Sequence, residues 1–303
     1  MRKSIVVLTT GGKALEIQMK NLPEVSEKID YILIVDDRAE KHINAKDLKR
    51  MLKENDVKKK GYNVEVYCGT DIIEEARIQL NPKNVSFMQT WIKTVHCLEY
   101  WYCQVCLGVE RAFFIEDDVI LLEGFESIFE EEKSMKYISM FNSGTIYQRK
   151  TFGNDLFFAV ALSEIADTEV DDLLDTNINV GQVYFGDDAD DFKWRLERMT
   201  RALFDSCLAE STLKFFKKKH GEKLPVSSFG NTFDERILGI IFYCCGISGG
   251  DLNDKVQIIV QDFKKVNWDK CKKFIKKNIV HVVMSSPKDD WWNKLAERGE
   301  IKA

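Results

Sequence analysis

The chain has 303 residues, of which 45% are hydrophobic and 31% charged, and its formal net charge at pH 7 is −5. This length allows a large core, either in one α/β domain or in two closely packed lobes. The acidic balance argues against a general nucleic-acid-binding protein, which usually carries a basic surplus. The longest nearly apolar stretch, residues 237–247, is well short of the roughly 18 residues that indicate a membrane span, and the N-terminal apolar run is too short for a signal-peptide core. We therefore expect a cytoplasmic protein with no membrane span and no nucleic-acid partner.

The eight cysteines do not show the spacing of a disulfide framework. Cys103 and Cys106 form a single C-x-x-C motif inside a helical pattern, whereas a zinc site requires further ligands. Buried reduced thiols are therefore the favoured interpretation, and a metal or redox role is the alternative.

Predicted strands and helices alternate along the first part of the chain. Strands that are separated by helices imply a largely parallel sheet, with ligands bound at the carboxyl ends of the strands. We expect an α/β fold with a mixed, mainly parallel sheet that is flanked by helices. The expected strands cover residues 4–10, 31–37, 62–70 and 112–122, and the expected helices cover residues 13–22, 45–55 and 86–107.

The pattern becomes looser after residue 125. A buried helix is expected to begin near residue 231, late strands are expected at residues 256–263 and 278–286, and a terminal helix at residues 287–300. No internal repeat, low-complexity tract or linker is visible. We expect one compact body with two sublobes and a boundary near residue 125.

Three consecutive acids, Glu116, Asp117 and Asp118, interrupt the hydrophobic pattern of the fourth expected strand. Unpaired carboxylates are costly to bury. One explanation is a tight turn in which the acids are solvated. The other is a site for Mg²⁺ or Mn²⁺, because such a cation offsets the burial of the charges and binds phosphate oxygens. It can also stabilise a departing diphosphate.

The order of these features resembles the GT-A (Rossmann-like) glycosyltransferases, which bind nucleotide sugars through an Asp-x-Asp type (DXD) motif. The shared features are a Thr/Gly-rich first turn, acids after the second strand, a long helix, and a strand that ends in Glu-Asp-Asp. That triplet matches the variant seen in type I N-acetylglucosaminyltransferases. The resemblance implies a nucleotide-sugar-binding sublobe at residues 1–125, and an acceptor-binding and catalytic sublobe at residues 126–303.

The resemblance also implies roles for individual residues. Asp118 would be the direct ligand of Mn²⁺ or Mg²⁺, and Asp117 a further metal ligand. Asp117 and Glu116 would contact metal-bound water, the ribose or the donor sugar, and Glu116 would be the most replaceable of the three acids. His281 would add a further metal ligand, although a lone histidine on an apolar strand is also typical of a satisfied core residue. Either Lys93 or Arg111 would approach the diphosphate of the donor, although both are also typical of solvated surface charges. The donor nucleotide would be contacted by Thr9, Thr10, Gly11, Asp36, Asp37 and Lys93.

A second group of acids begins the expected buried helix near residue 231. Thr232 and Glu235 form an S/T-x-x-E capping box, and Asp234 lies in the same first turn, where the helix dipole favours an anion. The resemblance implies instead that an acid at this place is the general base of an inverting enzyme. Since capping occupies Glu235, Asp234 is the expected base. Trp291 and Trp292, in the expected terminal helix, could either stack on a sugar ring or anchor the C-terminus.

We therefore expect a metal-dependent hexosyl- or pentosyltransferase of bacterial or viral type. It would move a sugar from a UDP- or GDP-sugar to an acceptor hydroxyl, with inversion if Asp234 is the base. A nucleotidyltransferase that makes activated sugars is one alternative. Such an enzyme typically has a basic, glycine-rich loop near its start, whereas residues 9–13 of this chain offer only one basic residue, Lys13. A non-catalytic nucleotide-binding protein of the same fold is the other. The sequence does not indicate the oligomeric state.

Overall fold

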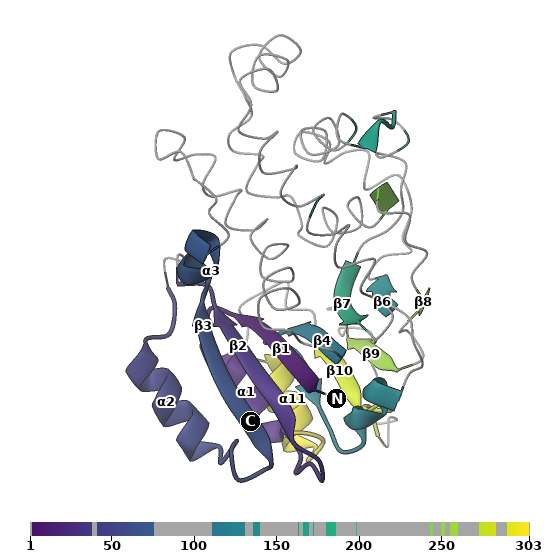
Figure 1. Ribbon diagram of the computed structural model, residues 1–303. Coiled ribbons are helices and arrows are strands. Elements are labelled where there is room, and N and C mark those ends of the chain that lie inside the picture. The colour runs from purple at the N-terminus through teal and green to yellow at the C-terminus, as the bar shows by residue number, and fades with distance from the viewer. Residues whose placement is uncertain are drawn as a thin grey trace.

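The structure is a computed structural model, and part of the chain is described. The main described ranges are 2–37, 41–75, 111–130, 136–139, 180–185, 250–251, 255–259, 273–282 and 290–302, with a few positions between 163 and 244. They form an α/β body with a seven-stranded sheet and a three-stranded sheet (Figure 1). The expected helix at residues 86–107 lies outside the described residues. None of the helices in the described ranges is long and apolar enough to cross a membrane.

The larger sheet has the order β3-β2-β1-β4-β7-β6-β8. Its first four strands in this order are parallel, β7 is antiparallel to both of its neighbours, and β8 is parallel to β6. The prediction of a mixed, mainly parallel sheet is thus confirmed. The strands are β1 (Lys3–Thr9), β2 (Ile29–Val35), β3 (Tyr62–Cys68), β4 (Arg111–Glu116), β6 (Lys136–Ser139), β7 (Val180–Phe185) and β8 (Gly250–Asp251).

The smaller sheet joins distant parts of the chain. In it β10 lies between β5, to which it is antiparallel, and β9, to which it is parallel. β5 follows β4 after two residues but belongs to the other sheet, so the acidic triplet stands where the chain changes sheets. The three strands are β5 (Val119–Leu121), β9 (Val256–Ile259) and β10 (Ile279–Val282).

Helices flank the larger sheet. In Figure 1, α1 and α11 lie behind the sheet, and α2 lies beyond its β3 edge. β1 and β2 are buried along almost their whole length, which explains their continuous hydrophobic sequences. The helices are α1 (Lys13–Asn21), α2 (Ala45–Glu54), α3 (Gly69–Glu75) and α11 (Asp290–Glu297), and η1 (Phe125–Glu130) is a 3₁₀ helix.

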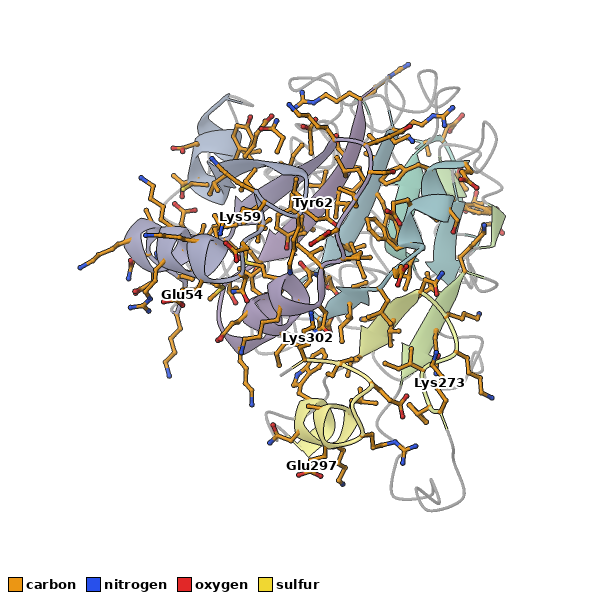
Figure 2. The ribbon with its side chains drawn as sticks, turned by 90° about the horizontal axis from the view of Figure 1, so that it is seen from below. Glu54, Lys59, Tyr62, Lys273, Glu297 and Lys302 are labelled. Carbon is orange, nitrogen blue, oxygen red and sulfur yellow. The ribbon has the colours of Figure 1, made fainter. Side chains whose placement is uncertain are left out.

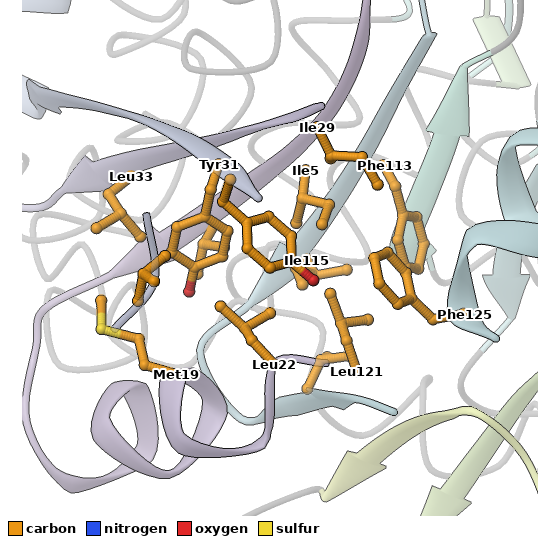
Figure 3. Close-up of a cluster of buried hydrophobic side chains, with 14 of the residues drawn as sticks. Ile5, Met19, Leu22, Ile29, Tyr31, Leu33, Phe113, Ile115, Leu121 and Phe125 are labelled. Atoms are coloured by element: carbon orange, nitrogen blue, oxygen red, sulfur yellow. The ribbon is translucent and has the colours of Figure 1, made fainter. Parts of the chain in front are cut away.

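The main core lies between the larger sheet and α1. Ile5, Leu33 and Ile115 from three neighbouring strands face Met19 of α1 and Leu22 just after it (Figure 3). All five side chains are buried. This packing holds α1 directly beneath the strands whose ends carry the acids.

A second core connects α1, the smaller sheet and α11. Ile17 of α1 belongs to the same cluster as Ile120 of β5, Val280 of β10, and Trp292 and Leu295 of α11. Trp292 is 1% exposed, so it anchors the C-terminal helix and offers no exposed ring face for sugar stacking. β10 and α11, which belong to the predicted second sublobe, thus share a core with α1 and β5 of the predicted first one, and the division at residue 125 stays a prediction.

Polar side chains fasten the C-terminal segment to this body. Asn21 Nδ2 donates to the carbonyl of Lys302 at 2.7 Å, and Lys302 N donates to Asn21 Oδ1 at 2.8 Å. Figure 2 shows Lys302 beside α1 and Glu297 on the outer side of α11. Glu300 accepts from the amides of Phe274 and Ile275 at 2.8 and 2.6 Å.

Replacing Glu300 by alanine should lower the free energy of unfolding by about 2–3 kcal/mol at pH 7, because it leaves the two amides and Arg298 Nε without their acceptor. Burial alone would raise the pKa of Glu300, but the hydrogen bonds from Arg298, Ile275 and Phe274 bring it below its ordinary value of 4.5. The stabilisation by the Glu300 carboxylate is therefore complete above about pH 4.5. It is lost as the pH falls through the lower pKa that Glu300 has in the folded protein.

Urea titrations at pH 7 and near pH 3 measure this difference. The exposed Glu297 is the matched control, and its replacement by alanine should change stability by no more than about 0.5 kcal/mol. An equal loss at both pH values for Glu300→Ala would contradict the ionic part of the explanation.

Candidate metal centre

Three polar segments meet at one edge of the larger sheet. Thr9 ends β1, Asp36 follows β2, and Glu116 ends β4. β1 lies between the other two strands and parallel to both, and its register sets Leu8 opposite Glu116. Asp36 N also donates to the carbonyl of Thr9 at 2.9 Å. Since α/β proteins bind ligands at the carboxyl ends of parallel strands, this edge is the natural place for a site.

Pairing between β5 and β10 brings His281 to this edge. His281 stands opposite Val119, and Val282 N donates to the carbonyl of Asp118 at 3.1 Å. His281 Nε2 lies 3.3 Å from Asp118 Oδ1 and 3.7 Å from Glu116 Oε2. One ligand atom from each of the three side chains lies within 4.8 Å of the other two. These residues, Glu116, Asp118 and His281, are called the metal cluster below.

The chemistry of the metal cluster fits a divalent cation. His281 is 1% exposed, while the side chains of Asp118 and Glu116 are 17% and 47% exposed. Asp118 Oδ1 is buried and accepts no hydrogen bond, which is costly for a carboxylate oxygen unless a cation offsets it. Two carboxylates suit Mg²⁺ or Mn²⁺, and an imidazole nitrogen favours a transition metal. Mn²⁺ therefore fits this set better than Mg²⁺.

An ion pair is the alternative explanation of the same contact. A protonated His281 beside Asp118 would offset the buried charge without a metal. The two arrangements respond differently to Mn²⁺, since only a metal centre gains stability when the cation is added.

Asp117 points toward a different partner. Its Oδ2 accepts a hydrogen bond from the hydroxyl of Thr9, and that hydroxyl accepts one from Gly11 N at 2.7 Å. Thr9 is 5% exposed. Its two hydrogen bonds connect the acidic turn with the turn that follows β1. The structure thus groups Glu116, rather than Asp117, with Asp118 and His281, and a role for Asp117 as a metal ligand stays a prediction.

The turn after β1 requires glycine. Gly11 has a φ of +87°, and a Cβ built there would lie 2.3 Å from the Cβ of Ile43. Ile43 is held in place because its amide donates to the carbonyl of Thr10 at 2.8 Å. Thr10 itself is exposed at this edge. The predicted contact of this turn with the donor nucleotide stays a prediction.

Replacing Gly11 by alanine should lower the free energy of unfolding by about 2 kcal/mol or more, because backbone strain and the clash with Ile43 add together. Gly12→Ala is the matched control, since Gly12 has a φ of +107° but nothing lies within 4 Å of its added Cβ. Denaturant titrations compare the two variants. A loss for Gly11→Ala no larger than that for Gly12→Ala would show that contact with Ile43 is unimportant.

The acids after β2 differ in their surroundings. Asp36 is 7% exposed. Asp37 Oδ1 accepts from Thr70 N at 2.9 Å, at the start of α3. Asp37 therefore has a structural function in holding α3, and contact of either acid with a nucleotide stays a prediction.

Three expected site residues, Lys93, Asp234 and Glu235, lie outside the described residues. The choice between a helix cap and a general base near residue 234 is therefore open. Arg111 is described and stands at the beginning of β4, where its Nη1 donates to the carbonyl of Phe129 at 2.6 Å. Since a strand rises about 3.3 Å per residue, Arg111 lies at the opposite end of β4 from Glu116. Its expected approach to a diphosphate at the acidic edge is wrong.

No protein-family model matches the chain. No curated protein matches it in sequence. Several solved structures are similar to it in fold. Mouse xyloside xylosyltransferase 1 is 10% identical, with 95% of this chain and 99% of that chain covered and a TM-score of 0.45.

The galactosyltransferase LgtC is also 10% identical, with 99% and 96% of the two chains covered and a TM-score of 0.47. The glycosyltransferase GlyE of Streptococcus pneumoniae TIGR4 is 12% identical, with 100% of this chain but 66% of that chain covered and a TM-score of 0.48.

Proposed function

We propose that the protein is a metal-dependent glycosyltransferase. It moves a sugar from a nucleoside-diphosphate sugar, such as a UDP- or GDP-sugar, to an acceptor hydroxyl. The observation that carries this proposal is the metal cluster of Glu116, Asp118 and His281 at the carboxyl edge of parallel strands. The resemblance of the first 125 residues to GT-A enzymes names the substrate class.

The residues of the cluster would hold Mn²⁺ through their side chains, Glu116 and Asp118 by carboxylate oxygens and His281 by Nε2. A cation held by these side chains would supply positive charge to offset the negative charge that builds on a leaving diphosphate. Strand β10 holds His281 in a buried position, and its pairing with β5 keeps the imidazole beside Asp118. The protein thus supplies a prearranged set of ligands.

Neighbouring residues of the chain prepare the place of the donor. Thr9 links the acidic turn to the first turn through its hydrogen bonds with Asp117 and Gly11. The exposed Thr10 and the acids Asp36 and Asp37 surround the same edge and are the proposed donor contacts. Asp234 is the proposed general base, which would take the proton of the acceptor hydroxyl and give inversion at the anomeric carbon.

A screen of donor hydrolysis tests the function. UDP-, GDP- and dTDP-sugars are incubated with the protein, with Mn²⁺ or with EDTA, and release of free sugar and nucleoside diphosphate is measured. We expect at least one donor to be hydrolysed with Mn²⁺ and not with EDTA. No turnover of any donor with Mn²⁺ would contradict the proposal. Release of inorganic pyrophosphate from a nucleoside triphosphate and a sugar phosphate would indicate a nucleotidyltransferase instead.

A further inference from the structure

A buried carboxamide lies directly under the acidic turn. Gln18 of α1 is 0% exposed, although glutamine is usually found at protein surfaces. Its Nε2 donates to the carbonyl of Glu116 at 3.0 Å and to the carbonyl of Val119 at 2.6 Å. Both hydrogens of the amide are therefore directed at the backbone on either side of Asp117 and Asp118.

This contact joins two strands that no common ladder connects. Glu116 is the last residue of β4 in the larger sheet, and Val119 is the first residue of β5 in the smaller sheet. A turn between two paired strands would be closed by their own backbone hydrogen bonds. Here the side chain of Gln18 donates to a carbonyl at each end of the turn.

A tyrosine fixes the orientation of this carboxamide. Tyr31 of β2 is 0% exposed, and its hydroxyl donates to Gln18 Oε1 at 2.6 Å. Burial, together with the neighbouring Tyr62 and Asp117, raises the pKa of Tyr31 well above its ordinary value, so the phenol keeps its proton. With Oε1 accepting from Tyr31, Nε2 is left to face the two carbonyls. Figure 3 shows Tyr31 within the packed core.

We propose that Gln18 is a positioning residue for the metal cluster. Its amide hydrogen bonds go to main-chain carbonyls and not to the side-chain oxygens proposed as ligands. Through the carbonyls of Glu116 and Val119 it holds the backbone of the acidic turn, and this sets the distance between the carboxylates of Glu116 and Asp118. Residues that hold the ligands of a metal in place without binding the metal themselves orient those ligands and raise their affinity for it. The inference rests on the proposed metal-dependent function.

The test is the affinity for Mn²⁺, followed by electron paramagnetic resonance without any sugar donor. Gln18→Met keeps the size of the side chain but removes both donors. We expect its dissociation constant for Mn²⁺ to rise about tenfold or more, while circular dichroism remains that of the wild type. Tyr31→Phe leaves the two bonds to the carbonyls but frees Oε1, and should raise the constant less.

Asn21→Leu is the matched control. Asn21 is a carboxamide on the same helix that donates to two backbone carbonyls, those of Ile17 and Lys302, both at 2.7 Å. Its replacement should lower stability and leave the affinity for Mn²⁺ unchanged. Wild-type affinity in Gln18→Met would overturn the proposal, whatever the result for Tyr31→Phe. So would an equal loss of affinity in Asn21→Leu, because the effect would then reflect stability alone.

The outcome is separable from that of the proposed function. If the wild type binds Mn²⁺ and Gln18→Met binds it more weakly, the positioning role stands even when no sugar donor is turned over. If the wild type binds no Mn²⁺, both the metal cluster and the role of Gln18 are wrong.

Discussion

Asp118→Asn should weaken the binding of Mn²⁺ by about 100-fold or more, since loss of a direct ligand exceeds the 10- to 100-fold effects of residues one step removed. Donor hydrolysis should fall with it. The variant should fold as well as the wild type in EDTA, because the substitution removes a buried carboxylate oxygen that accepts no hydrogen bond. Isothermal titration with Mn²⁺ and thermal unfolding in EDTA measure the two effects.

Asp56→Asn is the matched control for loss of an acid. Asp56 is exposed in the turn after α2 and pairs with Lys59 at 2.6 Å. Its replacement should leave the affinity for Mn²⁺ unchanged. Unaltered Mn²⁺ binding in Asp118→Asn would contradict the assignment of Asp118 as a ligand.

His281→Leu should abolish the stabilisation that Mn²⁺ gives to the wild type while changing the stability in EDTA by only about 1 kcal/mol. The reason is that a neutral imidazole in the metal cluster contributes chiefly when the cation is present. If His281 instead forms an ion pair with Asp118, its removal leaves an uncompensated buried charge and should cost about 3–5 kcal/mol in EDTA. Urea titrations with Mn²⁺ and with EDTA distinguish these two results.

Val280→Ala controls for damage to the same strand. Val280 precedes His281 in β10 and is 0% exposed. Its truncation should lower stability equally with Mn²⁺ and with EDTA. If His281→Leu lowered stability equally with Mn²⁺ and with EDTA, His281 would be an ordinary core residue, and its assignment as a metal ligand would be wrong.

The larger sheet could be predicted because its parallel strands carry their own signal. β1 and β2 are continuous hydrophobic runs, and the helices between the strands imply parallel pairing. The interruption at the acids was also expected. What sequence could not show is that β5 leaves the larger sheet, because its partner β10 lies far along the chain and no local pattern identifies it.

The same limit applies to the site. His281 was a candidate ligand by resemblance, yet its distance from Asp118 depends on the pairing of β5 with β10. The acidic triplet was visible in the sequence, but the grouping of Glu116 with Asp118 had no signal there, because Asp117 and Asp118 form the turn at which the chain passes from one sheet to the other. Gln18 had none either, because its place in a helical pattern does not reveal that a backbone turn lies above it.

Binding of UDP and GDP, measured by calorimetry with Mn²⁺ and with EDTA, tests the central claim most directly. A metal-dependent glycosyltransferase should bind at least one of the two nucleotides with Mn²⁺, bind it far more weakly in EDTA, and lose this dependence in Asp118→Asn. Nucleotide binding that neither Mn²⁺ nor Asp118→Asn alters, or no binding of either nucleotide, would contradict the claim.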